Sequence, residues 1–145
     1  MKILLKRILL VEDNEDDLEL TVDALKHYNL ANELDVARDG AEALDYVFCK
    51  NKWANRTNGN PVVILLDLKL PKVSGLEVLK KIRENNNTKM IPVVILTSSG
   101  EEQDIIEGYR LGTNAYVIKP VAFNEFIEAV KMVGAFWGII NKPAD

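Results

Sequence analysis

Three unbroken apolar stretches constrain the fold of this chain more than any other feature. They read ILLV, VVILL and VVIL, and they lie in short runs at Arg7–Val11, 62–66 and Val93–Thr97. Helices cover both faces of a parallel sheet, so its buried strands have no solvent-facing side and carry continuous apolar runs. The sequence therefore predicts a parallel sheet that contains these three runs as buried strands.

Two weaker strand candidates and five amphipathic helix candidates complete the pattern. The run Glu33–Ala37 mixes apolar and charged residues, as expected of an edge strand, and Ala115–Ile118 forms a fifth run. The helix candidates alternate with the runs and span residues 14–28, 40–50, 74–84, 101–111 and 121–140. Ser74 is a suitable N-cap residue for the third of them. Strict alternation of strand and helix predicts an α/β fold with right-handed crossovers.

Length and composition indicate one domain and exclude several function classes. A chain of 145 residues, of which 48% are hydrophobic, can bury one sizeable core. Its net charge of −4 gives no general attraction to nucleic acid or to an anionic membrane. Cys49 is the only cysteine, which excludes an internal disulfide. Lys6 and Arg7 interrupt the apolar N-terminal run, which has no small-residue cleavage site, so we expect a cytoplasmic protein.

One connection in this pattern is unusually long. Residues 51–60 are polar and contain the turn signal Asn58-Gly59. We expect a surface loop that exceeds the roughly 2–6 residues usual in such folds. Trp53 lies in this loop, and we expect it to pack locally; contact with a partner protein is the alternative.

Polar residues follow four of the five predicted strands. They are Glu12 and Asp13 after the first strand, Asp67 after the third, Thr97 at the end of the fourth and Lys119 after the fifth. Ligands of open α/β sheets bind outside the carboxyl ends of the strands. Each residue alone is ordinary, because acids after strands are usually solvated turn residues or helix caps. Their joint position predicts a site at one edge of the sheet.

The chemistry of this set points to phosphoryl transfer. Clustered carboxylates stay ionised most easily around a cation, and their oxygens suit Mg²⁺, which favours phosphate as a further ligand. A carboxylate in such a site can attack phosphorus, and the cation neutralises charge on the transferring group. A hydroxyl and an ammonium group then hydrogen-bond the phosphoryl oxygens.

These motifs resemble those of the response-regulator receiver family, the CheY-like phosphoacceptor domains of two-component signalling. The matching segments, within about residues 7–133, are ILLVEDN, ILLDLKLPKVSGLEVL, IPVVILTSS and AYVIKP. The resemblance implies a single receiver domain over residues 1–145, with its core at about 7–133 and an extended last helix to about 140. It also implies a flavodoxin-like (βα)5 three-layer sandwich with a parallel sheet of order 2-1-3-4-5.

The resemblance implies a role for each site residue. Asp67 would accept a phosphoryl group from a sensor histidine kinase, and Thr97 and Lys119 would bind that group. The implied Mg²⁺ ligands are Glu12, Asp13, Asp67 and the backbone carbonyl of Lys69. The Lys119-Pro120 peptide is expected to be cis, the isomer that proline makes accessible. Such a domain would catalyse only its own Mg²⁺-dependent phosphorylation and dephosphorylation.

Tyr116 matches the family's switch aromatic. It is expected to turn inward when Thr97 moves toward the phosphoryl group, which would reshape the surface around the fourth and fifth helices. A static, half-buried strand residue is the alternative. No output domain is expected after Asp145, so the output would be a contact with an unknown partner protein or relay of the phosphoryl group to a phosphotransfer domain.

A narrower resemblance is to the single-domain regulators that partner bacterial phytochromes. It rests on Asp16-Asp17, the loop 51–60, the segment DLKLPKVSG and the pair Phe136-Trp137. The apolar stripe of the last helix continues through that pair. Two interpretations remain open: a longer helix that folds onto its own domain, or a homodimer with Phe136 and Trp137 as anchors.

Three other functions compete with a signalling switch. Haloacid-dehalogenase-type phosphatases need a second acid two residues after the nucleophile, where this chain has Lys69. A flavodoxin-like cofactor carrier needs a hydroxyl- and glycine-rich phosphate loop, where this chain has Glu12 and Asp13. A pseudo-receiver scaffold would not need the intact set of site residues. The sequence therefore favours the switch.

Overall fold

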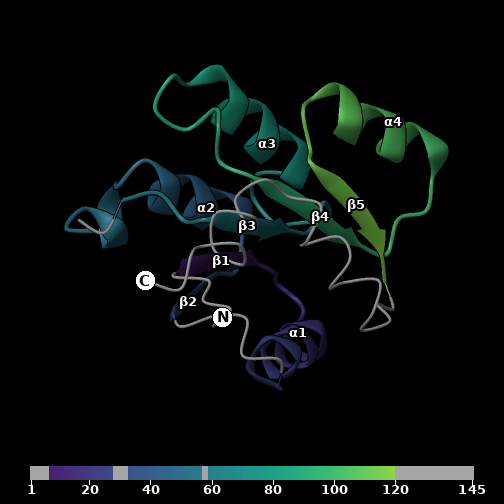
Figure 1. The fold of residues 1–145 in the computed structure, drawn as a ribbon, viewed down its shortest axis with the longest axis horizontal. Helices are drawn as coiled ribbons and strands as arrows, with labels where there is room; N and C mark the ends of the chain where they lie inside the picture. The colour runs from purple at the N-terminus through teal and green to yellow at the C-terminus, as the bar shows by residue number, and fades with distance from the viewer. Residues whose placement is uncertain (1–6, 28–32, 57–58, 120–145) are drawn as a thin grey trace, which may run out of the picture.

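The computed structural model describes residues 7–27, 33–56 and 59–119, which form a parallel sheet between helices (Figure 1). The strands are β1 Arg7–Val11, β2 Glu33–Ala37, β3 Val63–Leu66, β4 Val93–Thr97 and β5 Ala115–Ile118. The helices are α1 Glu15–His27, α2 Gly40–Val47, α3 Gly75–Glu84 and α4 Glu102–Arg110, with a short 3₁₀ helix η1 at Asn51–Trp53. In this part of the chain no helix combines the length and the apolar character needed to cross a bilayer.

The strand order is β2-β1-β3-β4-β5, and each strand runs parallel to its neighbour. This order confirms the expected flavodoxin-like topology. The third strand begins at Val63 rather than at Val62, although the Val62 N–H still donates to the Arg7 carbonyl at 2.9 Å. The predicted last helix at 121–140, the Pro120 peptide and the pair Phe136-Trp137 lie outside the described residues, so those predictions stay untested.

The core has two layers, one on each face of the sheet. On one face Ile8, Leu10 and Leu65 pack with Leu18 and Leu25 of α1. On the other face Leu9, Val11 and Ile64 pack with apolar residues of α2 and α3, among them Ala43, Val47, Val78 and Leu79. Figure 1 shows α1 on one side of the sheet and α2, α3 and α4 on the other. Alternate residues of each strand point to opposite faces, which explains why the apolar runs are unbroken.

The second helix ends at Val47, three residues earlier than the sequence predicts. Phe48 caps it, and Cys49 and Asn51 then take positive φ angles of 54° and 51°, which turn the chain into η1. Trp53 packs edge-on against Tyr46, with 4.8 Å between the ring centroids, which confirms the predicted local packing. The guanidinium of Arg56 lies 4.1 Å from the centroid of the Tyr46 ring. The described part of the long loop therefore packs on the Tyr46 ring, and Arg56 also donates to the backbone carbonyl of Tyr46.

Tyr46 itself is fully buried, and its hydroxyl donates a 2.6 Å hydrogen bond to Asp35 on β2. Burial, reinforced by the Asp35 carboxylate, raises the pKa of Tyr46 from 10.0 to about 12. The unfolded chain therefore loses this proton first, so the contribution of Tyr46 to stability is complete below pH 10 and is lost as the pH rises toward 12. The full loss is about 3 kcal/mol for such a change in pKa.

We therefore expect the free energy of unfolding of the wild type, relative to a Tyr46→Phe variant, to fall above pH 10. Phenylalanine keeps the packing against Trp53 but has no proton to lose, so the comparison removes the titration of every other group. Urea unfolding at pH 8.5 and at several values above pH 10 measures the difference. A constant difference across this range would contradict the assigned environment of the hydroxyl.

Two close backbone contacts fix the loop between β3 and α3. A Cβ atom at Gly75 would lie 2.1 Å from the carbonyl oxygen of Asp67, and one at Gly40 would lie 1.8 Å from the carbonyl oxygen of Val73. The N–H of Gly75 donates to Leu68, and the N–H of Gly40 donates to Pro71. Ser74 caps α3 by accepting from the N–H of Glu77, as predicted. The loop that starts at Asp67 is thus clamped against both α2 and α3.

Candidate functional site

Three carboxylates converge where β1 and β3 end. Glu12 and Asp67 are buried and Asp13 is exposed, and one oxygen from each lies within 4.8 Å of the others. Backbone bonds continue the sheet into this region, because Glu12 donates its N–H to Ala37 and Asp67 donates its N–H to Val11. The parallel register therefore delivers these side chains to one edge, as the sequence predicts.

Lys119 extends from the end of β5 into the same edge. Its N–H donates to the carbonyl of Thr97 at 2.8 Å, which continues the pairing of β4 with β5 past the last strand residue. Its Nζ atom contacts a carboxylate oxygen of Glu12 and lies 3.0 Å from both Asp67 Oδ2 and Asp17 Oδ2. Only 11% of the Lys119 side chain is exposed, and the three ion-pair partners of its ammonium group are all carboxylates.

The electrostatics of the cluster show an excess of negative charge. The pKa of Glu12 is raised to about 7, because burial, the largest cause, and the charge of Asp67 together outweigh the hydrogen bond from Lys119, which lowers it. Burial alone would lower the pKa of Lys119, but its hydrogen bonds with Glu12 and Asp17 and the charge of Asp67 outweigh burial and raise it. Lys119 therefore stays protonated, yet one ammonium group does not balance the surrounding carboxylates.

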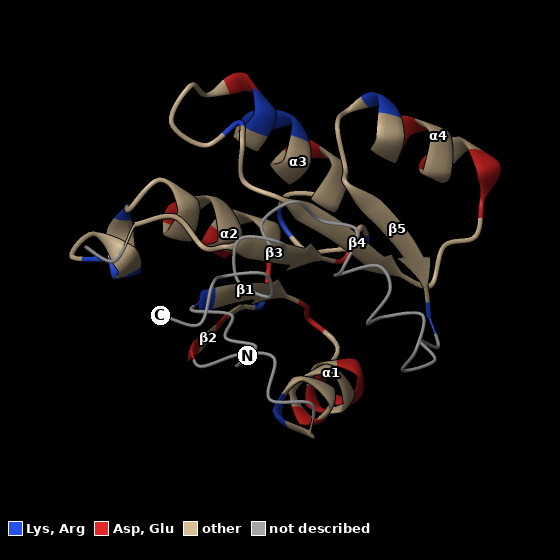
Figure 2. Cartoon of the chain, viewed as in Figure 1, with Lys and Arg blue, Asp and Glu red and all other residues tan. Residues whose placement is uncertain are grey.

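The donor set fits a hard divalent cation. Carboxylate oxygens are the preferred ligands of Mg²⁺ and Mn²⁺, and a cation that keeps several waters needs one open side, which exposed Asp13 provides. Figure 2 shows acidic residues along the segment from β1 into α1 and a basic segment directly after the end of β5. The cluster can therefore hold a cation and still keep Lys119 beside Asp67.

Both carboxylate oxygens of Asp67 have partners. Oδ2 accepts from Lys119, and Oδ1 accepts from the backbone N–H of Lys69 at 3.3 Å. The Lys69 side chain is exposed to solvent. The turn after β3 thus aims a backbone donor at the acid that ends the strand, and it orients the Asp67 carboxylate toward the cluster.

Thr97 lies at the end of β4 and is fully buried. Its hydroxyl oxygen accepts from the N–H of Ser99, at a long 3.4 Å. Ser99 has three further contacts: its hydroxyl donates to Asp104 of α4 at 2.5 Å and accepts from the N–H of Glu101 at 3.4 Å, and its carbonyl accepts from the Tyr116 hydroxyl at 2.8 Å. Burial raises the pKa of Tyr116. Ser99 therefore connects the hydroxyl at the strand edge with α4 and with β5.

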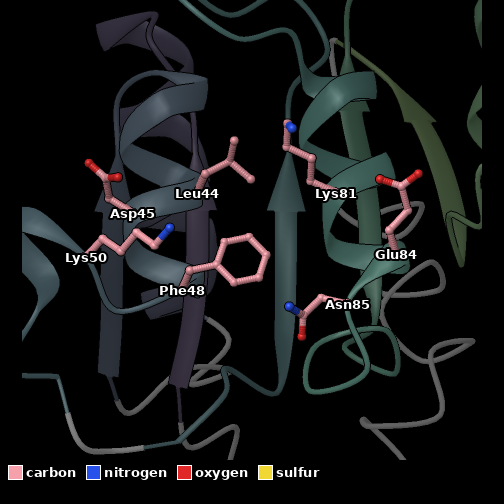
Figure 3. A pocket seen from close by; sticks show the side chains of 7 residues that line it. All are labelled: Leu44, Asp45, Phe48, Lys50, Lys81, Glu84 and Asn85. Atoms are coloured by element: carbon pink, nitrogen blue, oxygen red, sulfur yellow. The ribbon is translucent and has the colours of Figure 1, made fainter.

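Two hollows elsewhere on the described surface share no residue with this cluster. An open groove of about 490 Å³ separates α2 from α3 and is lined by Leu44, Asp45, Phe48, Lys50, Lys81, Glu84 and Asn85 (Figure 3). Its two lysines and two acids give it no net charge that would select one charged ligand. The acidic cluster is therefore the candidate site.

The structure brings Glu12, Asp13, Asp67 and Lys119 together, and it places Thr97 at the end of β4 and Tyr116 within the neighbouring strand β5. Asp17 is a further member of the site, which was not predicted from the sequence because Asp17 entered there only as part of a resemblance. The signal for Asp17 was available: Asn14 is a good N-cap residue, so an acid three positions later lies in the first helical turn, near the end of β1.

Comparison with known proteins gives a consistent family. The family model described as "Response regulator receiver domain" matches residues 8–131. The response regulator Rcp1 of Synechocystis sp. is 39% identical over 132 residues, which cover 91% of this chain and 88% of that protein.

Two solved structures resemble this chain over most of its length. The bacteriophytochrome response regulator AtBRR is 56% identical, with a TM-score of 0.84 over 95% of this chain and 99% of that chain. The Mn²⁺-bound form of Rcp1 is 39% identical, with a TM-score of 0.77 over 87% of this chain and 91% of that chain. A relative of this chain thus binds a divalent cation.

Proposed function

This chain belongs to the response regulator receiver domain family, and on that premise we propose that it is a phosphorylation switch whose phosphoacceptor is Asp67. One observation carries the proposal: Asp67 stands between carboxylates able to hold a cation and an ammonium group able to bind a phosphoryl oxygen. Structural ion pairs alone would not need this excess of acids around one lysine.

In the proposed reaction Asp67 takes the phosphoryl group from a phosphorylated histidine of a sensor kinase. A lone pair on a carboxylate oxygen forms the new oxygen–phosphorus bond. The phosphorus–nitrogen bond breaks, and its electron pair stays on the histidine nitrogen. In the deactivating step, which is hydrolysis, a water oxygen attacks phosphorus, the carboxylate leaves, and inorganic phosphate is released. The domain would catalyse only these two steps on itself.

The other residues of the site would position the group. Glu12, Asp13, Asp67 and the backbone carbonyl of Lys69 would hold Mg²⁺, which when bound neutralises charge on the transferring group. Lys119 would bind one phosphoryl oxygen, and Thr97 would donate its hydroxyl to another. Ser98 is exposed, so its small side chain leaves this side of the acid open.

The partners follow from the same premise. The resemblance to AtBRR and Rcp1 supports a bacterial phytochrome with histidine kinase activity as the donor, met in the cytoplasm. The output would be binding of a downstream protein, or transfer of the phosphoryl group to a phosphotransfer domain. A regulator that is changed by a kinase, rather than an enzyme that turns over a substrate, matches the family.

Acetyl phosphate provides the direct test. We expect the wild type to gain one alkali-labile phosphoryl group with Mg²⁺ present, and the rate to fall by about tenfold or more when the cation is chelated or when Asp13 is replaced by Asn. Intact-protein mass spectrometry with and without alkali treatment measures the uptake. A wild type that gains no phosphoryl group with Mg²⁺ present would refute the proposed function.

We further propose that Tyr116 carries the signal from Thr97 to α4. Movement of the Thr97 hydroxyl toward a phosphoryl oxygen would release the Ser99 N–H, and Ser99 contacts both Tyr116 and Asp104. In a Tyr116→Phe variant we expect phosphoryl uptake within about twofold of wild type and smaller phosphorylation-dependent NMR shifts in α4 amides. Tyr109→Phe is the control, because it alters an exposed tyrosine of α4 itself. Unchanged shifts in the Tyr116 variant would leave Tyr116 a static strand residue.

A further inference from the structure

We propose that Asp17 is a positioning residue that holds the Lys119 ammonium group while Asp67 is being phosphorylated. The proposal rests on the function proposed above. Of the three acids that contact Lys119 Nζ, Glu12 and Asp67 belong to the candidate cation cluster, and Asp17 does not. Asp17 is therefore the partner of Lys119 that would bind neither the cation nor the phosphoryl group.

The N-terminal cap of α1 explains why the Asp17 side chain is available. Asn14 accepts the N–H of Asp17 at 2.9 Å, so Asp17 stands third in the helix. An acid at this position usually turns back to the N–H of the cap residue. Here the Asn14 N–H donates to Glu12 instead, at 3.2 Å. The Asp17 carboxylate is thereby freed to reach across to Lys119.

Burial makes a constant partner necessary. The Lys119 side chain is 11% exposed, whereas that of Asp17 is 37% exposed. Leaving a buried ammonium group without hydrogen-bond acceptors costs free energy. When one acceptor is lost, the group therefore moves toward the acids that remain. Asp17 lies toward solvent and can keep water on its second oxygen, so it can hold the ammonium group beside the Asp67 carboxylate.

The direction of the effect follows from the two acids that would remain without Asp17. The ammonium group would then pair more closely with Glu12 and with Asp67 Oδ2. Both contacts oppose the reaction, because the first competes for a cation ligand and the second occupies an oxygen that must attack phosphorus. Removing Asp17 should therefore slow the transfer step itself, more than it weakens binding of the phosphoryl donor.

An acid in the first turn of a helix also stabilises the helix through its dipole. Asp16 is the matched control, because it lies in the same turn, is exposed, and is not among the described acids that pair with Lys119. Asp17→Asn and Asp16→Asn remove the same charge from the same turn. Any difference between them reports the contact with Lys119.

The experiment measures phosphorylation by acetyl phosphate with saturating Mg²⁺ in the wild type and in Asp17→Asn, Asp17→Glu and Asp16→Asn variants. We expect Asp17→Asn to lower the maximal rate about tenfold, with the KM for acetyl phosphate changed less than about twofold. Asp17→Glu should recover at least part of the rate, and Asp16→Asn should match the wild type. The same Asp17→Asn change in a Lys119→Ala background should have no further effect, because it acts through Lys119.

Three results would overturn the proposal. They are equal rates in Asp17→Asn and Asp16→Asn, a change confined to KM, or an undiminished effect of Asp17→Asn in the Lys119→Ala background. Circular dichroism checks the fold of each variant, and if Asp17→Asn is unfolded, the Asp17→Glu rate against Asp16→Asn decides the matter. Absence of Asp67-dependent uptake in the wild type would refute the proposed function and this inference together, whereas normal wild-type uptake isolates the inference.

Discussion

An Asp67→Asn variant is expected to take up no phosphoryl group, with a rate at least about a hundredfold below that of the wild type. The amide that replaces the carboxylate is nearly the same size, but its oxygen carries no full negative charge and is a poor nucleophile. The fold should survive, because Lys119 keeps its contacts with Glu12 and Asp17. We expect the free energy of unfolding to change by about 1 kcal/mol or less, since repulsion between two acids is lost together with one ion pair.

The measurement is intact mass after incubation with acetyl phosphate and Mg²⁺, with urea unfolding as a check on the fold. Asp23→Asn serves as the control, because it removes an exposed carboxylate of α1 that is not in the cluster. Its uptake should equal that of the wild type. If Asp67→Asn is labelled as fast as the wild type, another residue is the acceptor and the assignment of Asp67 is wrong.

A Gly75→Ala variant is expected to lose both stability and phosphoryl uptake. Alanine is the better helix former by about 1 kcal/mol, so helix propensity alone predicts a gain. The new Cβ atom, however, would lie 2.1 Å from the Asp67 carbonyl oxygen and 2.7 Å from the Leu68 Cα. Both are backbone atoms, which cannot rotate away, so we expect a net loss of about 3 kcal/mol.

The displacement of the backbone at Asp67 should also slow phosphoryl uptake. Asp67 is both the residue that the Cβ would displace and the proposed acceptor, and a misplacement of about 1 Å can cost a hundredfold in rate. Gly100→Ala is the matched control, because its Cβ would meet only Ile118 Cδ1, at an ordinary 3.5 Å. Urea unfolding and acetyl phosphate labelling compare the two variants. A Gly75→Ala protein as stable and as active as Gly100→Ala would contradict the close contact.

The sequence predicted the sheet well because its signal is local. Unbroken apolar runs arise only where both faces of a strand are covered, and this condition can be recognised from a few consecutive residues. The bounds of β1, β2, β4 and β5 agree with the runs identified from the sequence. Helix ends were predicted less well, because α2 ends where Cys49 and Asn51 take positive φ angles, and no glycine marks these positions.

Some contacts between residues far apart in the sequence were not predicted, because no local pattern encodes them. The sequence did not single out Tyr46, although its side chain is fully buried and orders the loop at 48–56, because the partners that bury it come from β2 and from beyond the helix. The apolar pattern of α4 does not show which position is buried, because the large Tyr109 side chain is 51% exposed. In α4 the buried position is Gly108, whose lack of a side chain lets Ile95 and Tyr116 approach.

By itself, then, the sequence determined which side chains stand at the carboxyl ends of the strands, because parallel strands of a buried sheet end at one edge whatever lies between them. That was enough to place Glu12, Asp13, Asp67, Thr97 and Lys119 together. Only the tertiary structure decided how they pair: Lys119 reaches three acids, and Asp17 is one of them. The choice depends on a helix cap, on burial and on distances across more than a hundred residues of chain, none of which a local pattern encodes.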